Sequence, residues 1–186
     1  MIMNKYISII FFIVIFIRFD AMAKDKSAFD FSFENAFNDE KIELSEYKNK
    51  VVMIVNTASE CGFTNQYKNM ENLWQQYKEK DFVIIAVPSN DFGKQEPGDI
   101  KKICEFVNTQ YGVTFPVTEK NVVKGKDAHP FYEWANSKAG MMGSPKWNFH
   151  KYIIDKNGNF VEWYTSSTKP DSEKVKKKID ELLKGS

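Results

Sequence analysis

Two compact, mostly apolar runs mark the centre of the chain. Residues 51–57, VVMIVNT, and residues 82–87, FVIIAV, are rich in β-branched side chains and predict two buried strands. Over residues 65–80, between the two runs, apolar side chains recur at helical spacing, at Tyr67, Met70, Leu73, Trp74 and Tyr77. The pattern therefore predicts a strand, a helix and a second strand.

The next predicted elements are a helix and a hairpin. Residues 99–110 predict a helix whose inward face is formed by Ile100, Ile103, Phe106 and Val107. Two further strands are predicted over residues 149–154 and 160–164. The sequence DKNGN between them is typical of a hairpin turn.

The two ends of the domain complete this plan. An amphipathic helix is predicted over residues 171–184, directly after Pro170. Near the other end Phe29, Phe31 and Phe33 alternate with polar residues, which indicates a short edge strand. Strands that alternate with helices predict an α/β domain with a central mixed β-sheet flanked by helices on both faces.

This order of elements resembles the thioredoxin type of fold, and it gives one cysteine a notable position. Active sites in such sheets lie at the carboxyl ends of the strands. Cys61 follows the 51–57 strand and precedes the 65–80 helix, so it lies at such an end. We therefore expect a functional site around this residue.

The first 23 residues have the features of a secretory signal peptide. Lys5 supplies a positive start, residues 7–17 are apolar, and Ala21-Met22-Ala23 forms a small-residue cleavage site. The apolar run is shorter than the roughly 20 residues that span a bilayer, although an uncleaved membrane anchor remains the alternative. We expect a periplasmic or secreted mature domain of residues 24–186, without stable membrane insertion.

Charge and histidine content narrow the classes of function. The formal net charge is +1, and the chain lacks the basic excess of a nucleic-acid binder. One basic cluster is interpreted as the solvated face of the last helix, at Lys174, Lys176, Lys177 and Lys178. His129 and His150 show no metal-ligand spacing, so no metal site is expected. We interpret His129 as a helix-start residue and His150 as a strand surface residue.

Cys61 and Cys104 are the two cysteines. In an exported protein such a pair is first interpreted as a structural disulfide, although a domain of this size does not need one. Cys61 precedes a helix start, where the dipole favours an anion, and Gly62 lets the backbone bend closely around the sulfur. These features suit a reactive thiolate, and the local context alone leaves an inert cysteine equally open.

Three separated segments resemble the signatures of the glutathione peroxidase family. Residues 49–64, NKVVMIVNTASECGFT, resemble the first signature, and residues 87–98, VPSNDFGKQEPG, resemble the second. Residues 147–152, WNFHKY, resemble the third. The segments occur in the family order, and the resemblance extends from about Phe29 to the last helix. Three motifs together are far more specific than any one of them.

The resemblance implies a catalytic set and a reaction. In that family a cysteine or selenocysteine works with a glutamine, a tryptophan and an asparagine, which correspond here to Cys61, Gln95, Trp147 and Asn148. Amide and indole N–H groups suit the stabilisation of a thiolate and of the developing alkoxide. The implied reaction is attack of the Cys61 thiolate on hydrogen peroxide or an organic hydroperoxide. The resulting sulfenic acid is reduced by a thioredoxin-like protein or glutathione, and no cofactor is implied.

The chain also departs from the family pattern. Ser89 and Asp91 stand where the second motif commonly has cysteine and glutamine, which changes local hydrogen bonding. The insertion that builds tetramer contacts is absent between Phe131 and Trp147. The resemblance therefore implies a monomer with an open site that accepts bulky hydroperoxides, including lipid ones. No set of arginines marks a glutathione pocket.

The resemblance also bears on Cys104. Thioredoxin-dependent members carry a resolving cysteine in the helix after the second motif, at the position that Val107 occupies here. Cys104 lies three residues earlier on the same helix face, about one turn away. We expect Cys104 to be a displaced resolving cysteine that needs local unwinding of the helix to reach Cys61. The alternative is a small residue that packs as a hydrophobe.

Other functions on the same fold stay open as alternatives. A disulfide oxidoreductase normally uses C-x-x-C, and Thr64 stands where its second cysteine would be. A metal-binding assembly factor of the cell envelope would need paired cysteines and a histidine near one loop, and the chain lacks that arrangement. Both alternatives therefore fit the residues less well than a peroxidase does.

Overall fold

The computed structural model describes residues 25–185, so the expected signal peptide lies outside the described residues. The central sheet has the strand order β4-β3-β5-β6. Its strands are β3 (Val51–Thr57), β4 (Phe82–Pro88), β5 (Lys151–Ile154) and β6 (Phe160–Tyr164). Strands β3 and β4 are parallel, whereas β5 runs antiparallel to both β3 and β6. The predicted mixed sheet is thus confirmed.

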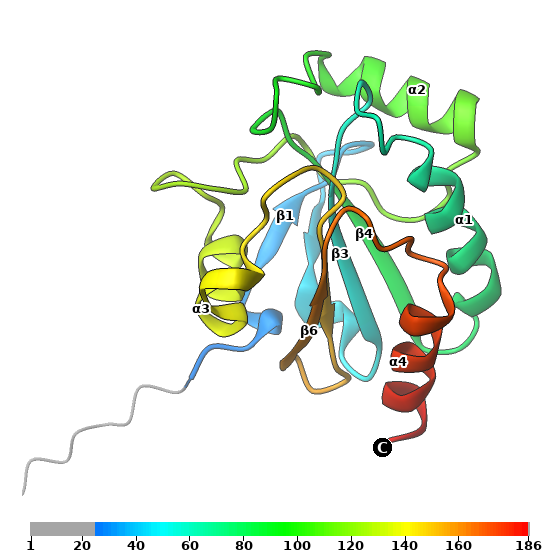
Figure 1. Cartoon of the computed structure of the whole chain (residues 1–186), viewed down its shortest axis with the longest axis vertical. Coiled ribbons are helices and arrows are strands. Elements are labelled where there is room, and N and C mark those ends of the chain that lie inside the picture. Colours follow the sequence, from blue (N-terminus) through cyan, green and yellow to red (C-terminus); the bar gives the residue numbers. More distant parts are fainter. Residues whose placement is uncertain (1–24, 186) are drawn as a thin grey trace, which may run out of the picture.

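Helices cover both faces of this sheet (Figure 1). Helices α1 (Gln66–Tyr77) and α4 (Glu173–Lys184) cover one face, and α3 (Pro130–Gly143) covers the other. Helix α2 (Ile100–Tyr111) lies beyond the end of the sheet from which the Cys61 segment leaves. Among residues 25–185, no helix is long and apolar enough to cross a membrane.

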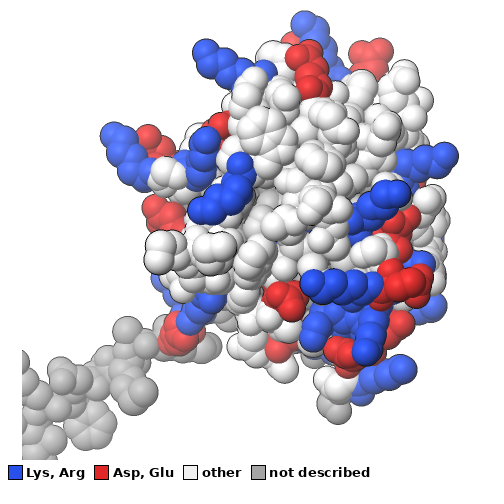
Figure 2. Space-filling view, viewed as in Figure 1, with Lys and Arg blue, Asp and Glu red and all other residues white. Residues whose placement is uncertain are grey.

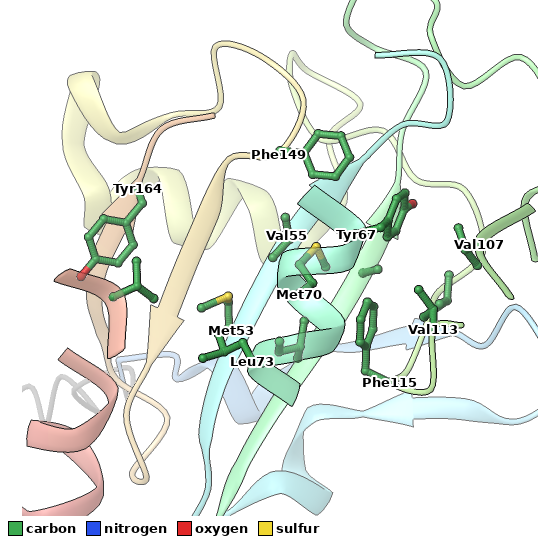
Figure 3. Close-up of a cluster of buried hydrophobic side chains, with 14 of the residues drawn as sticks. Met53, Val55, Tyr67, Met70, Leu73, Val107, Val113, Phe115, Phe149 and Tyr164 are labelled. Atoms are coloured by element: carbon green, nitrogen blue, oxygen red, sulfur yellow. The ribbon is translucent and has the colours of Figure 1, made fainter. Parts of the chain in front are cut away.

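Strand β3 is buried on both sides, which explains its continuous apolar run. Its odd-numbered residues, such as Met53 and Val55, pack with α1 and α4. Its even-numbered residues, such as Val52 and Ile54, pack in a second cluster with α3. Figure 3 shows the first cluster, in which the side chains of α1 point onto the sheet. Because side chains alternate along a strand, one seven-residue run supplies both halves of the core.

The basic cluster predicted as a solvated face lies on α4. Val175 and Ile179 are buried there, and Lys174 and Lys177 are exposed. Acidic and basic side chains are interspersed on the face shown in Figure 2, and many of them gather over α4. The interpretation as a solvated amphipathic face is confirmed.

The N-terminal part of the domain differs from the single edge strand that was predicted. A small antiparallel sheet forms from β1 (Ser32–Glu34) and β2 (Lys41–Glu43), between the 3-10 helices η1 (Ala28–Asp30) and η2 (Leu44–Tyr47). Phe33 lies in β1, whereas Phe29 lies in η1. The alternation of phenylalanines therefore marks burial here and overstates the length of the strand.

The start of β5 and the start of α3 show what the pattern missed. Phe149 has a φ of +62°, and its N–H donates to the carbonyl oxygen of Asn56 at 2.6 Å. Strand β5 therefore begins at Lys151, two residues later than predicted. Helix α3 was anticipated only through its first residues. His129 caps it, with Nδ1 accepting from the N–H of Phe131 at 3.2 Å, and Pro130 follows at the first helical position.

Candidate active site

Cys61 lies in a tight turn between β3 and α1, in a segment that we call the Cys61 loop, residues 58–65. Thr64 closes this turn: its Oγ1 accepts from the N–H of Cys61, and its own N–H donates to the Cys61 carbonyl oxygen, both at 3.0 Å. The N–H of Phe63 points at the sulfur, 3.4 Å from Sγ. A backbone donor at that position stabilises a thiolate, and the 8 % exposed side chain still has an opening to solvent.

Gln95 and Asn148 are brought together by the fold. Asn148 is fully buried, and its Nδ2 donates to Oε1 of Gln95 at 2.9 Å. Because this hydrogen bond uses the amide oxygen of Gln95, the NH₂ group stays available as a donor. The N–H of Glu60 donates to the carbonyl oxygen of Gln95 at 3.0 Å, which ties the Cys61 loop to the Gln95 loop, residues 89–98.

Trp147 lies at the rim of the site. It is 40 % exposed, and its ring packs on Phe92 with 6.2 Å between centroids. It also lines an apolar groove together with Phe63, Met142 and Trp163. Within residues 25–185, no hydrogen bond joins Sγ of Cys61 to Gln95, Trp147 or Asn148. Of the four predicted residues, Gln95 and Asn148 share a hydrogen bond, and Trp147 directly precedes Asn148 in the same loop.

Asn56 holds the turn that carries Trp147 and Asn148, and the sequence pattern did not identify it. Its Nδ2 donates to the carbonyl oxygen of Trp147 at 3.2 Å, and its Oδ1 accepts from the N–H of His150 at 3.0 Å. The signal in the sequence was a polar pair, Asn56 and Thr57, at the end of an apolar run. Both residues are fully buried in the structure. Such a pair at a strand end is a candidate for holding a functional turn.

A second network of hydrogen bonds, around Lys151, supports the turn that carries Asn148. Nζ of Lys151 donates to Oε1 of Gln66 at 2.7 Å and to the carbonyl oxygens of Thr165 and Thr168 at 3.2 and 2.6 Å. Ser166 in turn donates from Oγ to the carbonyl oxygen of Asn148 at 2.5 Å. Lys151 is fully buried, and this burial lowers its pKa to about 7.

The interpretation of His150 as a strand surface residue is wrong. His150 is 3 % exposed, and its ring stacks on Trp163 with 5.6 Å between centroids. Burial and the neighbouring charge of Lys151 lower its pKa to about 4, so the imidazole is neutral at physiological pH. It lines the apolar groove together with Trp147 and Trp163, which gives it a packing role there.

The motif departure at Asp91 has a visible consequence. Its Oδ2 accepts from the N–H groups of Val123 and Lys124 at 2.6 and 3.2 Å. The Nζ of Lys124 then lies 4.5 Å from the centroid of Phe92, the ring on which Trp147 packs. Asp91 therefore supports the rim of the site through a neighbouring loop.

Cys104 lies half-buried on α2, and both cysteines are free thiols. Its Sγ lies 3.8 Å from the carbonyl oxygen of Ala36, and burial together with the charge of Glu119 raises its pKa. Residues of α2, including Ile103 and Phe106, line a groove that Ser59 and Glu60 of the Cys61 loop border on the other side. Helix α2 therefore faces the Cys61 loop, and Cys104 is held as a thiol.

No group of three or more His, Cys, Asp or Glu side chains in the described part of the chain could hold a metal ion. The donors around Cys61 are backbone N–H groups and amides, which suit an anion or a peroxide oxygen. The groups that surround the sulfur are therefore neutral hydrogen-bond donors.

Comparisons with known proteins show relatives of this chain. A family model described as glutathione peroxidase matches residues 28–136. A glutathione peroxidase-like peroxiredoxin of Saccharomyces cerevisiae, HYR1, is 49 % identical over 144 residues, which cover 76 % of this chain and 87 % of that protein. The crystal structure of Trgpx in apo form is 40 % identical, covers 86 % of this chain and 96 % of its own, and superposes with a TM-score of 0.69.

A more distant match bears on the fold alone. A crystal structure of a thiol:disulfide interchange protein DsbE from Chlorobium tepidum, described as putative, is 22 % identical, with a TM-score of 0.59 over 86 % of this chain and 96 % of that one. The thioredoxin-like α/β fold predicted from the order of elements is confirmed by these superpositions.

Proposed function

The chain belongs to the glutathione peroxidase family and is a thiol peroxidase of that type, and we propose that Cys61 is the residue that attacks the peroxide. The observation that carries this proposal is the placement of its sulfur. Sγ accepts a hydrogen bond from the N–H of Phe63, in a loop that is tied by backbone to Gln95. Gln95, paired with Asn148, and Trp147 supply the neutral donors around the reacting oxygens.

The proposed reaction has two stages. The thiolate sulfur of Cys61 forms a bond to one peroxide oxygen, the O–O bond breaks, and the leaving oxygen takes a proton to give water or an alcohol. Cys61 is thereby oxidised to a sulfenic acid. A second thiol attacks that sulfur and releases water as a disulfide forms, and a further thiol then restores the thiol of Cys61.

We propose hydrogen peroxide and organic hydroperoxides as substrates, lipid hydroperoxides among them. The support is the apolar groove beside Trp147, lined also by Phe63, Met142 and Trp163, which suits the hydrocarbon part of a bulky substrate. We also propose that the enzyme acts as a monomer, because the segment between Phe131 and Trp147 is short.

The proposed reductant is a thioredoxin-like protein, with Cys104 as the resolving cysteine, and glutathione is the alternative. The raised pKa of Cys104 makes it a poor nucleophile while it is packed against Ala36. Local unwinding of α2 removes this burial and carries the thiol across the groove toward the oxidised Cys61. Cys104 therefore reacts in the unwound state.

We expect one equivalent of hydrogen peroxide, added without other thiols, to yield a peptide in which Cys61 and Cys104 are joined by a disulfide. Mass spectrometry after proteolysis measures this directly, and thioredoxin should then sustain turnover. The control is Cys104→Ser, which should accumulate sulfenic acid on Cys61. Sulfenic or sulfinic acid on Cys61 in the wild-type protein, with Cys104 still free, would show that an external thiol such as glutathione reduces Cys61.

We also propose that the enzyme is exported and that its signal peptide is removed after Ala23. The support is the Ala21-Met22-Ala23 site behind the apolar run. We expect the intact mass of the protein isolated from its native host to correspond to a chain that begins at Lys24. A mass that retains residues 1–23 would favour the membrane-anchor alternative.

A further inference from the structure

Glu96, the residue after Gln95, is a buried carboxyl group at the junction of two active-site loops. Its side chain is fully buried, and Oε1 accepts from the hydroxyl of Ser59 at 2.5 Å. Ser59 precedes Cys61 by two residues, and the backbone of Glu96 is held in turn by Oδ1 of Asn90 at 2.9 Å. Glu96 thus connects the Cys61 loop to the Gln95 loop through its side chain.

In the described part of the chain, the second carboxyl oxygen of Glu96 is buried without a hydrogen-bond partner, as are two buried hydroxyls. Oε2 of Glu96, Oγ1 of Thr57 and the hydroxyl of Tyr67 are all buried without a hydrogen-bond partner among the described residues. Burial raises the pKa of Tyr67, and the charge of Glu96 raises it further. The Thr57 hydroxyl lowers this pKa. Tyr67 therefore lies within electrostatic range of Glu96, and a buried Oε2 without a donor favours the protonated carboxyl group over a buried charge.

The surroundings of Glu96 favour its neutral form. Burial raises the pKa of this carboxyl group to about 7, and the charge of Glu60 adds to the increase. The hydrogen bond from Ser59 and the charge of Lys120 lower this pKa. Lys120 donates from Nζ to the carbonyl oxygens of Glu96 and Gly98, at 3.1 and 2.9 Å, rather than to the carboxyl group.

We propose that Glu96 is a positioning residue of the peroxidase reaction, and that its protonated carboxyl group clamps the Cys61 loop to the Gln95 loop. In this form Oε1 accepts from Ser59, and the buried Oε2 carries the proton and therefore no charge. Loss of the proton leaves a buried negative charge that attracts water and loosens the clamp, so the amide of Gln95 moves away from Cys61. The inference rests on Cys61 as the attacking residue.

Two substitutions separate the clamp from a purely structural role. Glu96→Gln keeps the acceptor for Ser59 and replaces the acid proton with a permanent N–H donor, so it mimics the protonated form at every pH. Glu96→Ala removes both groups, and Ser59→Ala removes the partner. Because small misplacements of catalytic groups are costly, we expect roughly 10- to 100-fold lower kcat/KM for these two alanine variants.

The pH profile is the deciding measurement. We expect kcat/KM of the wild-type enzyme to fall above about pH 7, and we expect that fall to be absent in Glu96→Gln, which retains wild-type activity at pH 6. Glu105→Gln, which removes an exposed carboxylate on α2, should keep the wild-type profile. An unchanged falling limb in Glu96→Gln, or an Ala variant within twofold of wild type, would overturn the proposal.

A measurement without turnover keeps this inference apart from the role of Cys61. The unfolded chain loses the Glu96 proton near pH 4.5, whereas the folded protein keeps it until about pH 7. The folded state then binds more protons over that interval, so its stability decreases as pH rises from 4.5 to 7. We expect urea midpoints of the wild type to decrease over that range relative to Glu96→Gln. Parallel curves would refute the inference even if Cys61 proves essential.

Discussion

Cys61→Ser is expected to abolish peroxide reduction, with a loss of turnover on the order of 10³-fold or more. The sulfur is the atom that bonds to the peroxide oxygen, and a serine hydroxyl is too basic to ionise without an activating base. The hydrogen-bonding groups around Cys61 are the N–H of Phe63 and the Thr64 hydroxyl, and neither removes a proton from serine. A coupled assay with hydrogen peroxide and a thiol reductant measures the loss.

The fold should tolerate this substitution, which makes the kinetic result interpretable. Serine is smaller than cysteine but keeps the turn, because Thr64 bonds to the backbone of residue 61 and not to its side chain. We expect the free energy of unfolding to change by less than about 1 kcal/mol. Near-normal turnover in a folded Cys61→Ser protein would refute the mechanism.

A graded loss should separate the nucleophile from its surroundings. Gln95→Ala removes the amide that pairs with Asn148 and faces the site, so it should reduce turnover by about 100-fold rather than abolish it. In this variant Cys61 should still be oxidised by peroxide, only more slowly. Stopped-flow measurement of that oxidation distinguishes the two roles, because Cys61→Ser removes the oxidised product itself.

The strands and helices of the core were predictable because they obey simple periods. The apolar run of β3 reflects a strand that is buried on both faces, and the helical spacing of α1 reflects a helix that is buried on one face. Both elements lie where the sequence predicts them. The β1–β2 hairpin and most of α3 were missed, since three-residue strands and a helix with a kink at Gly140, where φ is +69°, carry weak periodicity. Local pattern is informative where one face is continuously buried.

The candidate site was accessible from sequence only in part. The motif resemblance identified Cys61, Gln95, Trp147 and Asn148, and the geometry groups their loops at one end of the sheet. The residues that hold those loops were not found, because a buried charge looks like a surface charge in a sequence. Glu96 and Lys151 are both fully buried, and only the tertiary structure shows which groups surround them.

Lys151 gives the second large expected effect, on stability rather than on chemistry. Lys151→Met keeps the length of the side chain but removes the donor from a buried oxygen of Gln66 and from the partly buried carbonyl oxygens of Thr165 and Thr168. Each such loss costs about 1–3 kcal/mol. Removal of a buried ammonium group stabilises the folded protein, because the desolvation of that group is unfavourable. The balance between these two effects depends on pH.

The pH dependence follows from the lowered pKa of Lys151. Between about pH 7 and pH 10.5 the unfolded chain holds the lysine proton and the folded protein does not, so wild-type stability increases with pH over this interval. From pH 7 to pH 9 this contribution amounts to roughly 2–3 kcal/mol, at about 1.4 kcal/mol for each pH unit. Lys151→Met lacks it, so the variant should be more destabilised relative to wild type at pH 9 than at pH 6.

Urea unfolding of wild type and Lys151→Met at pH 6 and pH 9 tests this expectation. Groups such as Glu96 titrate in both proteins and cancel when the two free energies of unfolding are subtracted. The variant should also lose peroxidase activity, because Gln66 and Ser166 connect this network to the carbonyl oxygen of Asn148. A destabilisation that is equal at both pH values would mean that Lys151 keeps its charge in the folded protein. Its three hydrogen bonds would then outweigh the desolvation that burial imposes.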